Sequence, residues 1–291
     1  MTLAIGLQIA FAGLAVGAIY ALVALAIVIP YKASGVLNFG QGEIVMLGAY
    51  IALVLTQFGL NYWLVLFGTM ALGAGLGLVF ERVVIRPIVG APEFTIVIAT
   101  FAAGLLIKGI VRLYWQDTPY SLAPPFSSAP LNVGGVRLNV TFIWILVCTS
   151  LISTASALFF KYTRFGKAMR AASQSRAAAR LMGIVVERVF MVSWAISTAI
   201  GTVAGVLLAP VTGINPEIGL LSLKAIIAAV LGGFTSLGGA LIGGLLIGLI
   251  ESFAGIIAGS TAKNVAPFVV LIAVLLVRPY GLFGKMEVKR V

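Results

Sequence analysis

Long apolar runs separated by short polar segments extend over most of the 291 residues. A helix needs about 20 apolar residues to cross the hydrocarbon core of a bilayer, so each run is a candidate transmembrane helix. The runs lie at residues 6–30, 38–57, 61–81, 93–114, 141–160, 190–210, 222–236, 239–258 and 265–278. Those at 222–236 and 265–278 are short for complete spans, and the pattern therefore predicts about eight to ten crossings.

Composition supports a membrane protein. Hydrophobic residues make up 61% of the chain and charged residues only 9%, values far outside the range of soluble domains. We therefore predict an all-α polytopic membrane protein with a single transmembrane domain over residues 1–291. A net charge of +11 is also typical of nucleic-acid-binding proteins, but the basic residues here lie in the segments that connect apolar runs. Membrane topology explains the charge, and no nucleic-acid partner is expected.

The most basic segment, residues 161–189, connects two apolar runs and holds seven Lys or Arg against one acid, Glu187. Lys and Arg near the ends of spans resist translocation, so this segment should lie in the cytoplasm. Alternating the spans from there predicts an external N-terminus. The C-terminus, with Lys285, Lys289 and Arg290, should be cytoplasmic.

An alanine-rich composition predicts a short helix from Gly166 to Arg180, outside the bilayer. Arg176 and Arg180 would share one face of this helix. Lys167 and Arg170 would share another, so no broad apolar stripe is left. A compact helix of this kind suits docking into a groove on a cytoplasmic partner. The alternative is an ordinary basic loop that binds the head groups of membrane lipid.

Two regions interrupt the apolar pattern at corresponding places in the two halves of the chain. The first is SGVLNFGQGE, residues 34–43. The second comprises GINPE, residues 213–217, and LGGFTSLGGA, residues 231–240. Helices interrupted at matched positions are the best sequence indication of a translocation site in a transporter.

Polar residues at these interruptions are candidates for lining a translocation pathway. Asn38, Gln41 and Glu43 lead directly into the apolar run 44–55, where polar groups are costly unless they face the bundle interior, water or another subunit. The alternative is that these residues cap a helix start, with Glu43 near the positive end of the helix dipole. Asn215, in the second interruption, is predicted to line the same pathway.

One carboxylate, Glu251, lies deep inside an apolar run. It needs an ion-pair partner or a neutral protonation state, and we include it among the candidate pathway residues. Lys108 and Arg112 lie within or at the end of another run. We expect their long side chains to snorkel toward the external head groups.

Missing residue types exclude several chemistries. There is no histidine and only one cysteine, Cys148, so no catalytic triad, zinc site or disulfide framework is expected. No GxxxxGK[ST] phosphate loop occurs, so this chain should not bind ATP in that way. We predict no catalytic residue, metal or cofactor in this chain. An ATP-driven step would need an ATPase on another polypeptide, and the segment 161–189 is where we expect it to dock.

Three sequence blocks occur in order along the chain: GLAVGAIYALVALAIVIPYKASGVLNFGQGEIVMLGAY at 13–50, FGKAMRAASQSRAAARLMGI at 165–184 and AAVLGGFTSLGGALIGGLLIGLIES at 228–252. In content and spacing they resemble the membrane-spanning permease of a bacterial branched-chain amino acid ABC transporter. The likeness is to the first of the two paralogous permeases in such systems. The last block is glycine-rich and ends in a glutamate, Glu251, as the family's block does.

The resemblance implies an importer in the bacterial inner membrane, driven by ATP and Mg²⁺ in two cytoplasmic ATPase subunits. It also implies a second permease subunit and an extracytoplasmic binding protein that delivers branched-chain or related amino acids. The middle block would then contact the ATPases. The residues assigned to this coupling are Gly166, Lys167, Arg170, Ala171, Ala178, Arg180 and Gly183.

Two alternatives remain open at this point. Permeases for urea or short amides resemble this chain in the same blocks, because the binding protein usually selects the solute. A stand-alone channel or ion-coupled carrier would want intramembrane carboxylates, for which only Glu251 and Glu43 are available.

Overall fold

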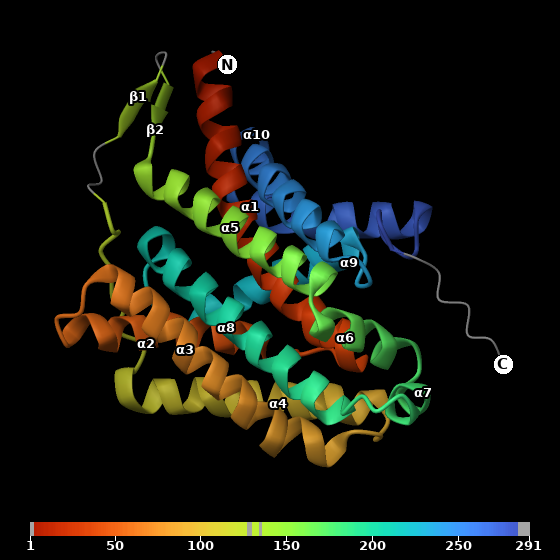
Figure 1. Ribbon diagram of the computed structural model, residues 1–291. Helices are drawn as coiled ribbons and strands as arrows, with labels where there is room; N and C mark the ends of the chain where they lie inside the picture. Colours follow the sequence, from red (N-terminus) through yellow and green to blue (C-terminus); the bar gives the residue numbers. More distant parts are fainter. Residues whose placement is uncertain (1–2, 127–129, 134–135, 285–291) are drawn as a thin grey trace.

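The computed structural model describes residues 3–126, 130–133 and 136–284, most of which are helical (Figure 1). The basic tail residues Lys285, Lys289 and Arg290 lie outside the described residues. The helices that form the bundle are α1 (Leu3–Ser34), α2 (Gln41–Gln57), α3 (Tyr62–Phe80), α4 (Glu93–Trp115), α5 (Val140–Tyr162), α8 (Val186–Thr212), α9 (Leu221–Gly232) and α10 (Leu237–Val277).

Within the described residues, six helices are long and apolar enough to cross a membrane, namely α1, α3, α4, α5, α8 and α10. The apolar helix α2 has 17 residues and α9 has only 12. Gly259 has non-helical dihedral angles and divides α10 into two arms, 237–258 and 260–277. Each expected run therefore corresponds to one helix or arm, which confirms the all-α polytopic fold. The run at 222–236 is shorter than expected, because α9 ends at Gly232.

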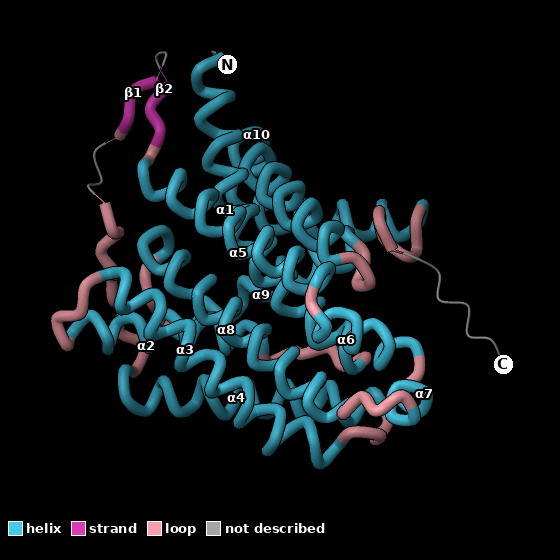
Figure 2. The backbone as a smooth tube through the Cα atoms, in the orientation of Figure 1, coloured by secondary structure: helices cyan, strands magenta, loops and turns pink. Residues whose placement is uncertain are grey.

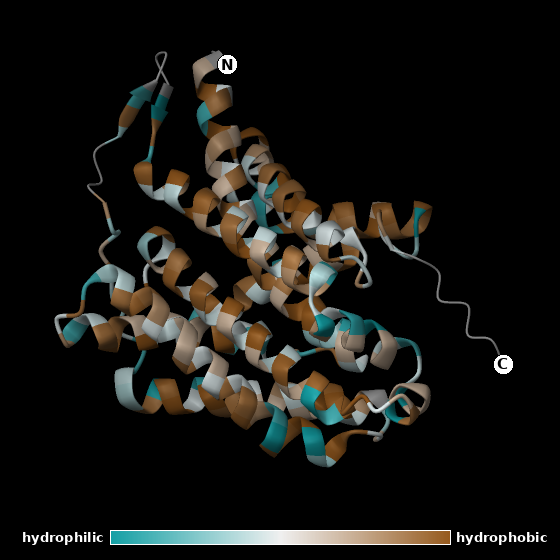
Figure 3. Cartoon of the chain, viewed as in Figure 1, coloured by the Kyte–Doolittle hydropathy of each residue, from teal (hydrophilic) through white to brown (hydrophobic). Residues whose placement is uncertain are grey.

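The shorter elements are η1 (Glu81–Ile85), η2 (Arg86–Ile88), β1 (Leu131–Val133), β2 (Val136–Leu138), α6 (Arg164–Gln174), α7 (Arg176–Leu181) and η3 (Pro216–Leu220). η1 and η2 extend α3 as a π-turn and a 3₁₀ turn, and η3 joins α8 to α9. β1 and β2 form an antiparallel hairpin before α5. α6 and α7 lie at one end of the bundle (Figure 2). Hydrophilic residues gather there, whereas the long helices are mostly hydrophobic (Figure 3).

The core is built around α1, whose residues 18–29 are almost completely buried. α1 packs against α5, α8, α9 and α10. Glycine permits the closest approaches, since a β-carbon at Gly248 of α10 would overlap the backbone of Gly17 in α1. A β-carbon at Gly205 of α8 would likewise overlap the Val45 carbonyl oxygen of α2. Small residues at such contacts bring backbones together in lipid, where apolar burial supplies little driving force for helix association.

The outer surface of the bundle is strongly apolar, and α4 shows this most clearly. Leu106 and Leu113 of α4 are 67% and 82% exposed. Such a face suits contact with lipid or with another membrane subunit rather than with water.

Candidate functional site

The helix α2 begins inside the bundle instead of at its surface. Gly35, with φ of +72°, turns the chain at the end of α1, and the loop that follows places the start of α2 against α8. Asn38 and Gln41, two of the predicted pathway residues, are both 0% exposed. Polar side chains buried so completely must find hydrogen-bond partners within the bundle.

Asn38, Gln41 and Ser197 of α8 form a cluster that we call the amide knot. Asn38 Nδ2 donates to Gln41 Oε1 at 2.9 Å, and Asn38 Oδ1 accepts from the Gly40 backbone N–H at 3.0 Å. Ser197 Oγ donates to the Ala26 carbonyl of α1 at 2.6 Å and lies 3.4 Å from Gln41 Oε1. Gln41 Nε2 finds no hydrogen-bond acceptor among the residues that the structure describes. The amide knot therefore links α1, α2 and α8, and the amide N–H groups of Gln41 are available to donate.

The start of α2 also packs against the second interruption, at η3, and against α4. A β-carbon at Gly42 would overlap the carbonyl oxygen of Gly219 in η3. The Glu43 carboxylate lies between α4 and η3, because β-carbons at Gly104 and Gly219 would lie 3.1 and 3.4 Å from its two oxygens. The two interruptions, far apart in the sequence, are thus in direct contact.

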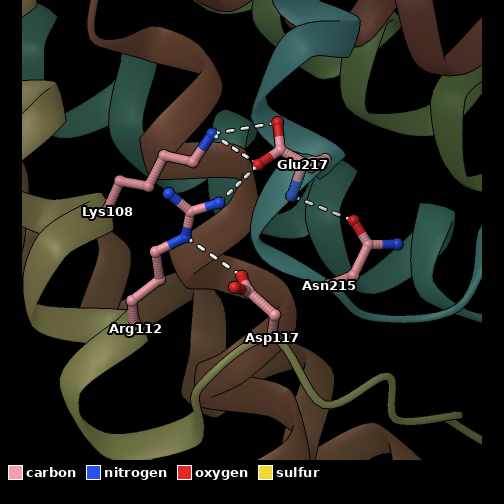
Figure 4. A network of polar contacts seen from close by, with 5 residues as sticks. All are labelled: Lys108, Arg112, Asp117, Asn215 and Glu217. Carbon is pink, nitrogen blue, oxygen red and sulfur yellow. Dashed lines mark hydrogen bonds and ion pairs between the residues drawn. The ribbon is translucent and has the colours of Figure 1, made fainter.

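Glu217 joins η3 to α4 through ion pairs (Figure 4). Lys108 Nζ lies 3.0 Å and Arg112 Nη2 2.8 Å from Glu217 Oε1, and Arg112 Nε lies 3.0 Å from Asp117 Oδ1. Lys108 and Arg112, which the sequence predicted to snorkel toward lipid head groups, both turn toward Glu217 and are ion-paired. Asn215 caps η3, because its Oδ1 accepts from the Glu217 backbone N–H at 2.9 Å. Asn215 therefore positions Glu217 for these ion pairs.

Glu251 belongs to a second polar cluster. Tyr20 Oη donates to Glu251 Oε2 at 2.5 Å, and Lys224 Nζ donates to Oε1 at 2.7 Å. Lys263 Nζ lies 3.9 Å from the same oxygen. The sequence-based expectation that Glu251 needs a partner is met by Lys224. In the described part of the chain, no hydrogen bond or ion pair joins Glu251 to the amide knot, so Glu251 lies in a different cluster from Asn38 and Gln41.

The residues of these clusters that sequence reasoning missed include Tyr20, Ser197, Glu217 and Lys263. Glu217 was detectable, because it stands two residues after Asn215 in the same polar interruption. Ser197 gave no signal, since a serine within an apolar helix commonly bonds its own backbone. Lys263 gave none either, because its role depends on the fold of α10 about Gly259.

The basic segment 161–189 forms two helices, and the prediction of one continuous helix from Gly166 to Arg180 is wrong. Ser175 is extended, with φ of −157° and ψ of 112°, and its side chain accepts from the Ala178 N–H at 3.2 Å. It therefore ends α6 and caps α7, a position that serine favours.

The helix α6 also has a buried stripe, although the spacing of its basic residues predicted that no broad apolar stripe would be left. Gly166, Met169 and Ala172 are buried on one face of α6, as expected for residues three apart. A β-carbon at Gly166 would overlap the Phe160 carbonyl oxygen, and Arg170 Nη1 donates to that oxygen at 2.7 Å. Gly166 and Arg170 thus hold α6 against the end of α5.

Two further arginines attach α7 to the bundle. Arg176 Nη2 donates to the carbonyl of Ser34, the last residue of α1, at 2.6 Å. Arg180 Nη2 lies 2.5 Å from Glu187 Oε1 at the start of α8. Arg176 and Arg180 therefore connect α7 directly to the end of α1 and the start of α8.

The turn after α7 exposes apolar side chains. Leu181 and Met182 are 88% and 82% exposed. Gly183, with φ of +79°, reverses the chain immediately after them, a conformation that favours glycine. Of the other residues predicted to take part in coupling, Lys167 and Ala178 are exposed and Ala171 is half-buried.

Comparison with known proteins places this architecture among transport proteins. Residues 9–277 match the family described as branched-chain amino acid transport system, permease component. The chain is 33% identical, over 98% of its length and 97% of the relative's, to the high-affinity branched-chain amino acid transport system permease protein LivH of Escherichia coli K12. It is 35% identical, over 96% of each chain, to the corresponding protein BraD of Pseudomonas aeruginosa. A probable LivH of Methanocaldococcus jannaschii is 32% identical over 90% of this chain and 88% of its own.

Proposed function

The chain belongs to the family of permease components of branched-chain amino acid transport systems, and on that premise we propose that it is the membrane-spanning subunit of an ATP-driven amino acid importer. It is a multi-pass membrane protein with an apolar outer surface and no phosphate-loop sequence of its own. The solute is a branched-chain or related amino acid, delivered by an extracytoplasmic binding protein.

The observation that carries this proposal is the way α6 and α7 are held. They expose Leu181 and Met182 to a partner, while Arg176 and Arg180 bond them to α1 and α8. Those two helices also supply Ala26 and Ser197 to the amide knot. A protein that binds α6 and α7 and moves them would therefore also move α1 and α8, which surround the start of α2.

The proposed partners are a second permease subunit and two cytoplasmic ATPases, which bind ATP and Mg²⁺. ATP binding would favour one of two arrangements of the assembled transporter, and α6 and α7 would transmit that preference to this chain. Six of the seven coupling residues proposed from the sequence then fall into two groups, and the seventh, Ala171, is half-buried. Gly166, Arg170 and Arg180 hold the segment to the bundle, and Lys167, Ala178 and Gly183 lie on its accessible side.

The pathway is proposed to pass the contact between α2, η3 and α4. Asn38 and Gln41 close the inner end of this contact, and Gln41 Nε2 supplies a donor to a passing solute or water. Glu43 lies between the facing glycines, and Asn215 fixes η3 beside it. Broken helices that meet in this manner are typical of transporter binding sites.

The proposed topology has an external N-terminus and a cytoplasmic C-terminus in the inner membrane. Two contacts support it. The Tyr31 ring, near the end of α1, lies 5.0 Å from that of Phe234, and the Leu282 N–H donates to the Leu231 carbonyl at 2.8 Å. The final described residues thus lie at the α6–α7 end of the bundle, and the start of α1 lies at the other.

Uptake of radiolabelled leucine tests the function. Proteoliposomes that hold the complete complex and its binding protein should accumulate leucine only with ATP, and excess isoleucine or valine should compete. Excess urea or acetamide should not compete; if either does and isoleucine does not, the substrate is an amide. Proteoliposomes with this chain alone should take up nothing. Leucine entry through the chain alone without ATP would instead show a channel or ion-coupled carrier.

A further inference from the structure

A cavity of about 600 Å³ lies between α1, α8, η3, α9 and the two arms of α10. Its lining includes Tyr20 of α1, Lys224 of α9 and Glu251 of α10, together with Asn215 and Glu217 of η3. Its volume is within the range of small-molecule sites in proteins. The cavity is thus contiguous with the second interruption, and its lining residues include none from α2 or the amide knot.

The fold of α10 creates this cavity. Gly259 has φ of +83° and ψ of −177°, a conformation essentially reserved for glycine, and it turns the second arm back on the first. The two arms are close, because a β-carbon at Gly255 would lie 3.3 Å from Cβ of Lys263. Lys263 and Asn264 of the second arm therefore line the same cavity as Glu251 of the first.

The charges on the cavity wall do not balance. Glu251, with 3% of its side chain exposed, faces two ammonium groups, at 2.7 Å for Lys224 and 3.9 Å for Lys263. Glu217 also lines the cavity, but Lys108 and Arg112 already neutralise its charge. One positive charge is therefore in excess. In a membrane-spanning segment such a charge is costly unless an anion accompanies it.

The lysines also have unused donors. Of the three N–H groups of Lys224, one is donated to Glu251 and one to Asn264 Oδ1 at 3.2 Å. Lys263 makes no hydrogen bond within the described part of the chain, and its only ion pair is the long one to Glu251. The rest of the lining includes apolar side chains such as Val16, Leu208 and Leu221.

We propose that this cavity binds the carboxylate of an aliphatic solute between Lys224 and Lys263, with the aliphatic group against α1, α8 and α9. Charge-assisted hydrogen bonds from two ammonium groups to one carboxylate are stronger than neutral ones. The Lys224 side chain is only 20% exposed, whereas that of Lys263, at 52%, is open to an incoming solute. Glu251 and Tyr20 hold Lys224 in place for this contact. The choice of leucine as the solute rests on the proposed function, whereas the carboxylate chemistry rests on the lysines alone.

Cysteine protection in the assembled complex tests the site. Ser260 and Thr212 both line the cavity, and the single native cysteine, Cys148, is buried. In Ser260→Cys or Thr212→Cys, a small hydrophilic thiol reagent should modify the new cysteine, as measured by mass spectrometry of this chain. Leucine and 4-methylpentanoate, which share the carboxylate, should slow modification by roughly tenfold at saturation. Leucinamide, which lacks the carboxylate, should not slow it.

Lys263→Met should abolish the protection by leucine while the complex still assembles, because Lys263 makes no hydrogen bond in the described structure. Arg278→Met, which removes one positive charge beyond the end of α10, is the matched control. In this variant leucine should still protect the cysteine. Inert cysteines at both positions, equal protection by leucinamide, or full protection in Lys263→Met would overturn the proposal. So would a phospholipid that co-purifies with the complex and is lost in Lys263→Met, since its phosphate would then be the anion.

Leucine uptake tests the proposed function and cysteine protection tests the carboxylate site, so either proposal can fail without the other. Leucine uptake without cysteine protection would leave the importer standing and remove the carboxylate site. Protection by leucine without ATP-driven uptake would keep the site and remove the importer.

Discussion

The amide knot and the Glu251 cluster are both polar centres in an apolar bundle, but they are built differently. The amide knot uses neutral groups, is 0% exposed at Asn38 and Gln41, and joins three helices at close range. The Glu251 cluster uses full charges and borders a cavity of about 600 Å³. Neutral amides can be buried at modest cost once they are hydrogen-bonded, whereas charges that leave water need partners. The first centre is therefore suited to holding helices together beside the proposed pathway, and the second to binding a charged group.

The largest loss of stability should follow from removing one partner of the Glu251 ion pair. Lys224→Met leaves the Glu251 carboxylate buried with Lys263 only at 3.9 Å, and we expect a loss of stability of about 3–5 kcal/mol. Thermal unfolding of the purified complex, followed by size-exclusion chromatography, measures this loss. Because Glu251→Gln removes the charge that Lys224 balances, the double variant should recover most of the stability. A double variant as unstable as Lys224→Met would show that Lys224 contributes by packing.

The backbone that creates the charged centre should be the next most sensitive feature. Gly259→Ala places a side chain at φ of +83°, and we expect a cost of about 1–3 kcal/mol together with weaker protection of the cavity cysteines by leucine. Gly109→Ala is the control, since no atom lies within 4 Å of a β-carbon at Gly109. Equal unfolding temperatures for both variants would contradict the proposed role of the kink in α10.

Breaking the neutral centre should cost a comparable or smaller amount. Gln41→Met removes the acceptor of Asn38 Nδ2, and we expect a loss of about 1–3 kcal/mol. Gln57→Met, at the exposed end of the same helix, should be nearly neutral. The same unfolding assay compares them. Similar unfolding temperatures for the two variants would show that the amide knot does not hold α2 in place.

The smallest effect on stability, but a clear effect on coupling, is expected at the α6–α7 segment. Arg180→Gln breaks an exposed ion pair with Glu187 that should contribute less than about 1 kcal/mol. The complex should therefore assemble normally and show reduced substrate-stimulated ATPase activity. Arg164→Gln, at the first position of α6, is a control for loss of charge in the same segment. Unchanged stimulation in Arg180→Gln would count against force transmission through α7.

The helices were predictable from the sequence because the bilayer imposes a length on every apolar run. The polar residues Asn38, Gln41 and Glu251 were also predictable, since each interrupts such a run. Their partners were not. Ser197 meets Gln41 only because α8 crosses α2, and Lys263 reaches Glu251 only because Gly259 folds α10 back.

Local structure explains the remaining errors. The break between α6 and α7 at Ser175 was hidden by alanine-rich sequence on both sides, although serine is a favoured helix cap. The ion pairs of Lys108 and Arg112 were not predicted either, because the carboxylate that they contact, Glu217, lies more than a hundred residues later in the chain. Pairings of this kind depend on tertiary structure and have no local sequence signal.

Site-specific photo-crosslinking in the native membrane tests the central claim most directly. A photoreactive residue at Met182, in the exposed turn after α7, should form a crosslink to a phosphate-loop ATPase, identified by mass spectrometry. The same residue at Leu106, on the exposed apolar face of α4, should crosslink to lipid or to a second hydrophobic subunit and not to an ATPase. Recovery of the ATPase from position 182 alone is the result we predict. No ATPase at position 182, with this chain recovered only as a self-oligomer, would contradict an importer driven through α6 and α7.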